Sequence, residues 1–248
     1  MIIKPDILYK DGLYLDLYIP EGEELDLFVY FHGGGLCGGD RKGVEPFAET
    51  LAKRGIATAS VEYRMYPNAK FPEFIEDCAA SVAWLRDNIS AFGKCRRIFV
   101  GGSSAGGYIS MMLCFDKRYL NKVGMKPTDI AAYIHDAGQP TAHFNVLKEY
   151  GIDSRRVIVD ETAPMFFVGT EESYSPMLFI VSDGDMPARY EQTMLMVKAL
   201  EHFGHTEGVE LCVMHGSHCE YVYKTDGEGE GILAKAMLSF IDKRFPTA

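Results

Sequence analysis

Apolar, strand-like segments alternate with helix-like segments along most of this chain. The strand-like segments are 13–19, 25–31, 56–63, 97–100, 130–134, 177–182 and 209–214, and the helix-like segments are 46–54, 72–92, 105–115, 188–203 and 231–245. Such alternation predicts a mostly parallel central sheet with helices on both faces. In these sheets the loops at the carboxyl ends of the strands carry the functional site.

Residues 138–175 break the alternation. This segment is rich in Thr, Pro, Tyr, Phe and charged side chains. Its position between two predicted strands suggests a small helical cap over the site. We expect one domain spanning 1–248, with 138–175 as the cap or insertion.

Composition excludes several classes of function. The formal net charge of −10 disfavours a nucleic-acid partner, because phosphate binding needs clustered Lys and Arg. Apolar residues make up 47% of the chain, which is enough for a large core. No signal peptide or membrane-spanning run is recognisable, and the six cysteines are scattered, so we expect a cytoplasmic protein with reduced thiols and no membrane partner.

The turn Gly102-Ser103-Ser104-Ala105-Gly106 has the pattern G-x-S-x-G. It follows a predicted strand and opens a predicted helix, which is the context that holds a nucleophilic serine in a strained turn. Small neighbours are needed there, and the helix N-terminus favours developing negative charge. Ser104 takes the nucleophile position and Ser103 is the x residue. The alternative is a plain Gly/Ser turn.

A second glycine-rich stretch, His32-Gly33-Gly34-Gly35, follows the predicted strand 25–31. Acyl transfer needs N–H donors aimed at the tetrahedral oxyanion, and this HGGG-type loop supplies them. We expect the donors to be Gly34, Gly35 and Ala105, and His32 to fix the loop. A phosphate-binding loop is the alternative, but the Walker Lys-Ser pair and the dinucleotide spacing are missing.

A nucleophilic serine needs a base and an acid that orients the base, in the chain order Ser, acid, His. His218 lies in a loop after the last predicted strand, and His215, at the strand end, is the runner-up. Asp185 lies beyond the end of strand 177–182. Asp183 is the alternative acid, which could instead bond the backbone of its turn.

One competing constellation is a zinc site. It would use the side chains Cys212, His215, His218 and Cys219, which cluster in one segment. Their spacing fits no common zinc pattern. We therefore expect neither a metal nor a cofactor.

Together these motifs resemble the α/β-hydrolase fold of the esterase/lipase branch related to hormone-sensitive lipase. The matching pieces are HGGG at 32–35, EYRMYPNAKFPEFIEDCAASVAWL at 62–85, GGSSAG at 101–106, SPMLFIVSDGD at 175–185 and HGSH at 215–218. In that family the Tyr-Arg turn (Tyr63-Arg64) and the aspartate (Asp77) are structural. The short middle insertion, including 139–164, is similar to compact bacterial carbohydrate esterases of the acetyl xylan and feruloyl type.

The resemblance implies a serine carboxylic ester hydrolase with Ser104, His218 and Asp185 as its triad. The expected partner is a small-molecule ester carrying a short acyl group or a carbohydrate-linked acetyl or feruloyl group. An arylformamidase-like amidase would use the same triad. A hydrolase-fold binding protein without turnover is the alternative from a different class, although such proteins often lose the histidine or the acid.

Overall fold

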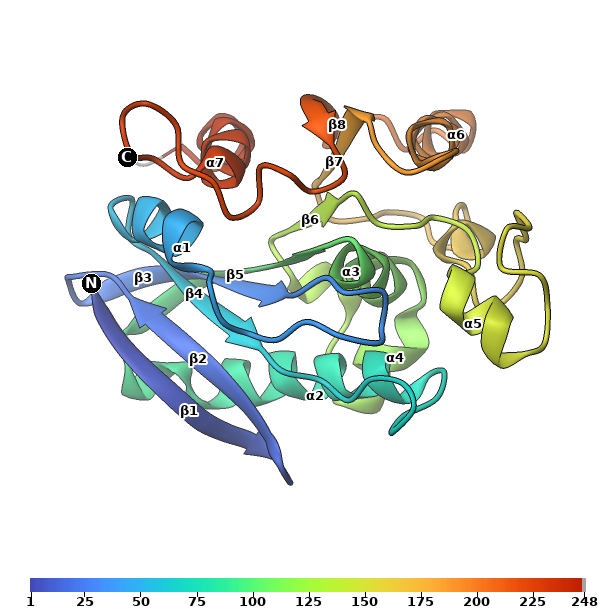
Figure 1. Ribbon diagram of the computed structural model, residues 1–248. Helices are drawn as coiled ribbons and strands as arrows, with labels where there is room; N and C mark the ends of the chain where they lie inside the picture. Colours follow the sequence, from blue (N-terminus) through green and yellow to red (C-terminus); the bar gives the residue numbers. More distant parts are fainter. Residues whose placement is uncertain (247–248) are drawn as a thin grey trace.

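The alternating segments form one eight-stranded sheet with helices on both faces (Figure 1). The computed structural model describes residues 1–246, so the last two residues of the predicted domain lie outside the described part. The strands are β1 (Ile2–Lys10), β2 (Leu13–Ile19), β3 (Glu24–Phe31), β4 (Ile56–Val61), β5 (Lys94–Ser103), β6 (Ala132–Asp136), β7 (Met177–Gly184) and β8 (Val209–Ser217). The α-helices are α1 (Glu45–Ala52), α2 (Glu73–Asn88), α3 (Ala105–Phe115), α4 (Lys117–Lys122), α5 (Phe144–Glu149), α6 (Arg189–His202) and α7 (Ile232–Arg244).

The strand order is β1-β2-β4-β3-β5-β6-β7-β8. β2 pairs antiparallel with β1 and β4, and the strands from β4 to β8 are parallel. The carboxyl ends of β3, β5, β7 and β8 therefore meet at one edge of the sheet. Each predicted site residue lies at or just beyond one of these ends.

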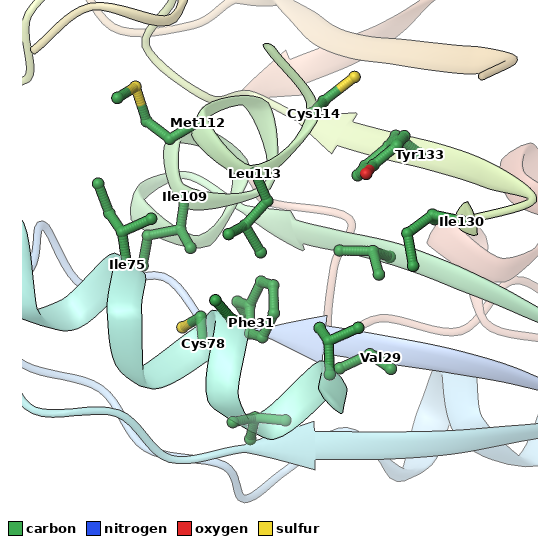
Figure 2. Close-up of a cluster of buried hydrophobic side chains, with 14 of the residues drawn as sticks. Val29, Phe31, Ile75, Cys78, Ile109, Met112, Leu113, Cys114, Ile130 and Tyr133 are labelled. Carbon is green, nitrogen blue, oxygen red and sulfur yellow. The ribbon is translucent and has the colours of Figure 1, made fainter. Parts of the chain in front are cut away.

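Two apolar layers sandwich the sheet. In β3 the side chains alternate, so that Val29 and Phe31 join the core beneath α2 and α3, whereas Phe28 and Tyr30 join the core beneath α1 and α7. Figure 2 shows the first of these cores, with Ile75 of α2 packed near α3. Burial on both faces explains why β3 reads as a continuous apolar run.

Several boundaries differ from the sequence-based expectation. β1 was not expected, because its exposed side chains and Pro5 hide the pattern of an edge strand. The predicted helix 72–92 is shorter, since α2 ends at Asn88 and a 3₁₀ helix, Ile89–Ala91, follows it. β5 and β8 extend beyond the predicted 97–100 and 209–214, because ladder pairing with neighbouring strands continues past their apolar centres.

The insertion between β6 and β7 contains α5 and a 3₁₀ helix, Pro164–Phe167. It has a small core of its own formed by Ala142, Leu147 and Ala163. α5 joins this segment to the glycine-rich loop, because Asn145 Nδ2 donates a 2.5 Å hydrogen bond to the carbonyl oxygen of Gly35.

Candidate active site

Ser104 stands between the end of β5 and the start of α3. Its backbone has φ 56° and ψ −112°, a conformation that L-residues rarely adopt. The Ser104 N–H donates a 2.8 Å hydrogen bond to the carbonyl oxygen of Asp136, which holds the turn against β6. Strain at one residue, supported by the neighbouring strand, is typical of a functional side chain.

The flanking glycines are required by close packing. A Cβ atom on Gly102 would lie 2.4 Å from the Phe31 carbonyl oxygen, and one on Gly106 would lie 1.9 Å from the same atom. The turn between β5 and α3 thus presses directly on the end of β3. Only residues without a side chain let the helix start this close to the sheet.

His218 and Asp185 lie in line with the serine. His218 Nε2 is 2.8 Å from Ser104 Oγ, and His218 Nδ1 is 2.5 Å from Asp185 Oδ1. The Asp185 side chain has no exposed area, whereas the His218 side chain is 23% exposed. The three residues predicted from the sequence thus form one hydrogen-bonded chain, although up to 114 positions separate them.

The Asp185 carboxylate is kept ionised by its surroundings. Burial acts to raise its pKa, but hydrogen bonds from His218 and from the N–H groups of Met186 and Ser182 outweigh burial and lower it. The Met186 N–H lies 2.7 Å from Asp185 Oδ1. Ser182 also ties this segment to the histidine strand, because its hydroxyl donates to the Ser217 carbonyl oxygen at 2.9 Å.

The runner-up residues form a second, exposed pair. His215 Nδ1 lies 2.7 Å from Asp183 Oδ2, and the two side chains are 96% and 48% exposed. Asp183 also accepts a hydrogen bond from the Gly216 N–H, so it bonds a backbone group, although that group lies in β8 and not in its own turn. This pair makes no hydrogen bond to Ser104 in the described chain.

The glycine-rich loop lies beside the serine. Gly34 has φ 116°, and a Cβ atom there would meet the Gly38 carbonyl oxygen at 1.9 Å, so only glycine fits. The N–H groups of Gly34, Gly35 and Ala105 donate no hydrogen bond to any other group within residues 1–246. Gly34 and Gly35 also line the pocket beside Ser104.

His32 fixes this loop. Its Nδ1 lies 2.7 Å from the Gly33 carbonyl oxygen, and its ring stacks on Tyr63 with the centroids 4.4 Å apart. The Tyr63 hydroxyl donates to the His32 carbonyl oxygen at 2.7 Å. Burial lowers the pKa of His32, which keeps the ring neutral. The guanidinium of the next residue, Arg64, donates two hydrogen bonds of 2.7 and 2.9 Å to Asp77, consistent with a structural role.

A pocket of about 440 Å³ opens over Ser104. Its walls come from the glycine-rich loop, the serine turn, the insertion and the segments after β7 and β8. The lining residues are Gly33, Gly34, Gly35, Gly39, Ser103, Ser104, Phe144, Met186, His218, Cys219, Val222 and Tyr223. Sequence reasoning did not find Phe144, Met186 or Tyr223, because no motif marks an apolar pocket wall.

The residues of the competing zinc site have other partners. His218 bonds Ser104, and His215 bonds Asp183. Cys219 Sγ lies 3.7 Å from His218 Nε2, and burial raises its pKa, so it is a thiol. Across residues 1–246 no cluster of three or more His, Cys, Asp or Glu side chains is arranged to hold a metal ion. None of the helices in that range is long and apolar enough to cross a membrane.

Comparisons with known proteins place the chain in a family. The model of the BD-FAE family matches residues 15–200, which is most of the chain and includes Ser104 and Asp185. The chain belongs to the BD-FAE family. The resemblance to the esterase/lipase branch is thereby confirmed.

Individual relatives match parts of the chain. Lipase 2 of Moraxella sp. (strain TA144) is 39% identical over 87 residues, which cover 34% of this chain and 20% of that protein. The chain spans about a third or less of the length of the first curated relatives that it matches.

Solved structures similar to this BD-FAE member cover nearly its whole length. Esterase 2 of Thermogutta terrifontis, phosphorylated by paraoxon, has a TM-score of 0.77 at 18% identity, covering 99% of this chain and 95% of that chain. A truncated carbohydrate esterase from gut microbiota has a TM-score of 0.80 at 17% identity, covering 98% and 96%. These likenesses confirm the predicted α/β-hydrolase fold.

Proposed function

We propose that this BD-FAE protein is a serine carboxylic ester hydrolase that acts on short-chain acyl or carbohydrate-linked acetyl or feruloyl esters. One observation carries the proposal: the continuous hydrogen-bonded chain from Ser104 through His218 to the buried Asp185. A nucleophile, a base and an orienting acid in this geometry are what acyl transfer needs. The adjacent free N–H groups of the glycine-rich loop add to the case.

In the first step, Ser104 Oγ attacks the ester carbonyl carbon and its proton moves to His218 Nε2. Asp185 holds the Nδ1–H of His218, which fixes the ring orientation and stabilises the positive charge that forms. The new oxyanion accepts hydrogen bonds from Gly34, Gly35 and Ala105. The proton on His218 then passes to the leaving alcohol, and an acyl group remains on Ser104.

In the second step, water attacks the acyl-serine. His218 takes a proton from this water and then returns a proton to Ser104 Oγ as the carboxylic acid leaves. The exposed part of the His218 side chain faces the pocket, where water can reach it. This scheme needs only the chain's own residues.

The substrate class rests on the pocket and on the family. A volume of about 440 Å³ suits a small ligand, and the wall is largely apolar, with Phe144 and Met186 on it. Such a wall favours an uncharged acyl group. The similar fold of a gut carbohydrate esterase supports a sugar-linked alcohol.

An arylformamidase-like amidase remains the second candidate, because it would use the same three residues. A formyl amide and an acetyl ester differ in the leaving group and hardly in the oxyanion. The rates of hydrolysis of formyl-kynurenine and of p-nitrophenyl acetate, measured under the same conditions, distinguish the two candidates.

The test is hydrolysis of p-nitrophenyl acetate, butyrate and octanoate and of methyl ferulate by the wild type and by Ser104→Ala. The matched control is Ser81→Ala, which removes a buried hydroxyl on α2 that donates a hydrogen bond to the Cys78 carbonyl oxygen. We expect Ser104→Ala to lose at least about 10³-fold in kcat and Ser81→Ala to keep the wild-type rate.

Paraoxon gives an independent readout. Since esterase 2 of Thermogutta terrifontis is phosphorylated by it, we expect one phosphoryl group on Ser104, found by mass spectrometry of peptides and absent in Ser104→Ala. Ester hydrolysis by Ser104→Ala at the wild-type rate would overturn the mechanism. Cleavage of formyl-kynurenine alone would favour the amidase, and no turnover of any substrate would favour the binding protein.

A further inference from the structure

A buried carboxylate that is not part of the Ser104–His218–Asp185 chain adjoins the Ser104 turn. Asp136 is the last residue of β6 and is 1% exposed. In the sheet it pairs with Ser103, the neighbour of Ser104. Its side chain points to the α1/α7 face, because residues alternate along a strand and Ile134 belongs to that core.

Asp136 touches both halves of the site. Its carbonyl oxygen accepts the 2.8 Å hydrogen bond from the Ser104 N–H. Its Oδ1 accepts a hydrogen bond from the hydroxyl of Tyr221, a residue that is 4% exposed. Tyr221 lies three residues after His218 in the same turn. One residue thus bonds the serine turn with its backbone and the histidine turn with its side chain.

The histidine turn comprises residues 218–223. Its backbone hydrogen bonds run only between residues 217 and 224 in the described structure. Cys219 has φ 54°, so the turn carries strain that its surroundings must support. The side chains of Tyr221 and Val222 are buried in the α1/α7 core, and Cys219 packs against it. In addition, the Tyr221 hydroxyl gives this turn a hydrogen bond to the end of β6.

We infer that Asp136 is a positioning residue, which holds the His218 turn in register with the Ser104 turn through the Tyr221 hydroxyl. The inference rests on the proposed function and deepens it. Loss of the bond would let His218 move relative to Ser104, and a displacement near 1 Å costs catalysis up to about 100-fold. Binding of substrate would change little, because neither side chain lines the acyl pocket.

Three variants test this. Tyr221→Phe keeps the ring and removes only the hydroxyl, whereas Asp136→Ala removes the acceptor. Asp136→Asn keeps an oxygen acceptor of the same shape. The matched control is Tyr133→Phe, a buried tyrosine of β6 whose hydroxyl donates to the Pro127 carbonyl oxygen at 3.0 Å.

The readouts are kcat and KM on p-nitrophenyl acetate, with active sites counted by the p-nitrophenol burst from paraoxon. We expect kcat per active site to fall about 10- to 100-fold in Tyr221→Phe and Asp136→Ala, with KM within about threefold. Asp136→Asn and Tyr133→Phe should stay within about threefold of the wild-type kcat. A purely structural role would lower the melting temperature and the number of active sites but not kcat per site.

Wild-type kcat per site in Tyr221→Phe would overturn the inference. So would a loss in Asp136→Asn as large as that in Asp136→Ala, because the charge rather than the bond would then matter. Amide hydrogen exchange of residues 218–223 tests the role of the Tyr221–Asp136 hydrogen bond independently of enzyme activity. We expect faster exchange in Tyr221→Phe than in Tyr133→Phe. If the wild type neither hydrolyses esters nor reacts with paraoxon, the proposed function fails. If exchange of residues 218–223 is unchanged in Tyr221→Phe, the positioning role of Asp136 is rejected, whatever the result for the proposed function.

Discussion

Gly106, the first glycine of α3, offers a sharp test of how the site is assembled. A Cβ atom at this position would lie 1.9 Å from the Phe31 carbonyl oxygen, 2.5 Å from its carbonyl carbon and 2.9 Å from the His32 carbonyl oxygen. Ordinary contact starts at 3.4 Å, so in Gly106→Ala the helix and β3 must separate by about 1.5 Å (3.4 minus 1.9). All three contacts are with backbone atoms, which no rotamer change can relieve.

This separation acts on the chemistry more than on the fold. β3 leads into the glycine-rich loop and α3 carries Ala105, so the predicted oxyanion donors move apart. A misplacement of about 1 Å can cost about 100-fold in rate. Overpacking itself costs about 1–3 kcal/mol, which lowers the melting temperature by roughly 2–4 °C per kcal/mol in a protein of this size.

The assay compares kcat for p-nitrophenyl acetate with thermal unfolding in Gly106→Ala and in Gly227→Ala. The control glycine lies in the loop before α7, and a Cβ atom there meets nothing within 4 Å. We expect kcat to fall about 100-fold or more in Gly106→Ala, with cooperative unfolding retained, and no change in Gly227→Ala. A Gly106→Ala enzyme within about threefold of the wild-type kcat would refute the argument from close packing.

Further predictions concern the acid, the pocket wall and pH. Asp185→Asn should lower kcat about 10⁴-fold, as expected when the base loses its orienting carboxylate, while Asp183→Asn, which changes the exposed pair, should leave kcat within about twofold. Phe144→Ala enlarges the pocket and should raise the octanoate-to-acetate ratio of kcat/KM at least about threefold, and an unchanged ratio would exclude Phe144 from the acyl pocket. Burial raises the pKa of Asp136 from 3.8 to about 6. The nearby Ser103 hydroxyl, the hydrogen bond from Tyr221 and the nearby His218 act against burial, whereas Asp185 adds to it. The folded protein then binds this proton at a higher pH than the unfolded chain. The contribution of Asp136 to the free energy of unfolding therefore falls as the pH rises from about 4 to about 6, by roughly 3 kcal/mol at about 1.4 kcal/mol per tenfold change. Denaturant unfolding at pH 4, 5, 6 and 7 should show this fall in the wild type relative to Asp136→Asn, and parallel curves would contradict it.

Local sequence patterns predicted those parts of the candidate site that depend on residues close together in the chain. The glycines around Ser104 and in the 32–35 loop reflect backbone approach, which a sequence displays directly because only one residue type permits it. The alternation of strands and helices predicted the parallel sheet and hence the edge where its strands end. His218 followed from its place after the last strand.

Other features depended on segments that are distant in the sequence. Asp183 and Asp185 each bond a histidine. The two pairs differ in the structure, because the Asp183 pair is exposed whereas His218 of the Asp185 pair bonds Ser104. Asp136 lies at the carboxyl end of β6, where the rule for parallel sheets could have marked it, but its bond to Tyr221 spans 85 residues. The edge strand β1 was hidden, because an edge strand exposes most of its side chains and so lacks the apolar signal of a buried one.

The sequence by itself thus determined the fold class, the serine turn, the glycine-rich loop and the segments that carry the proposed base and acid. Each of these depends on local backbone geometry or on the periodicity of buried side chains. Only the tertiary structure decided which carboxylate meets which histidine, which side chains wall the pocket and how the His218 turn is tied to β6. These depend on the order of strands in the sheet, which brings together chain segments that share no local pattern.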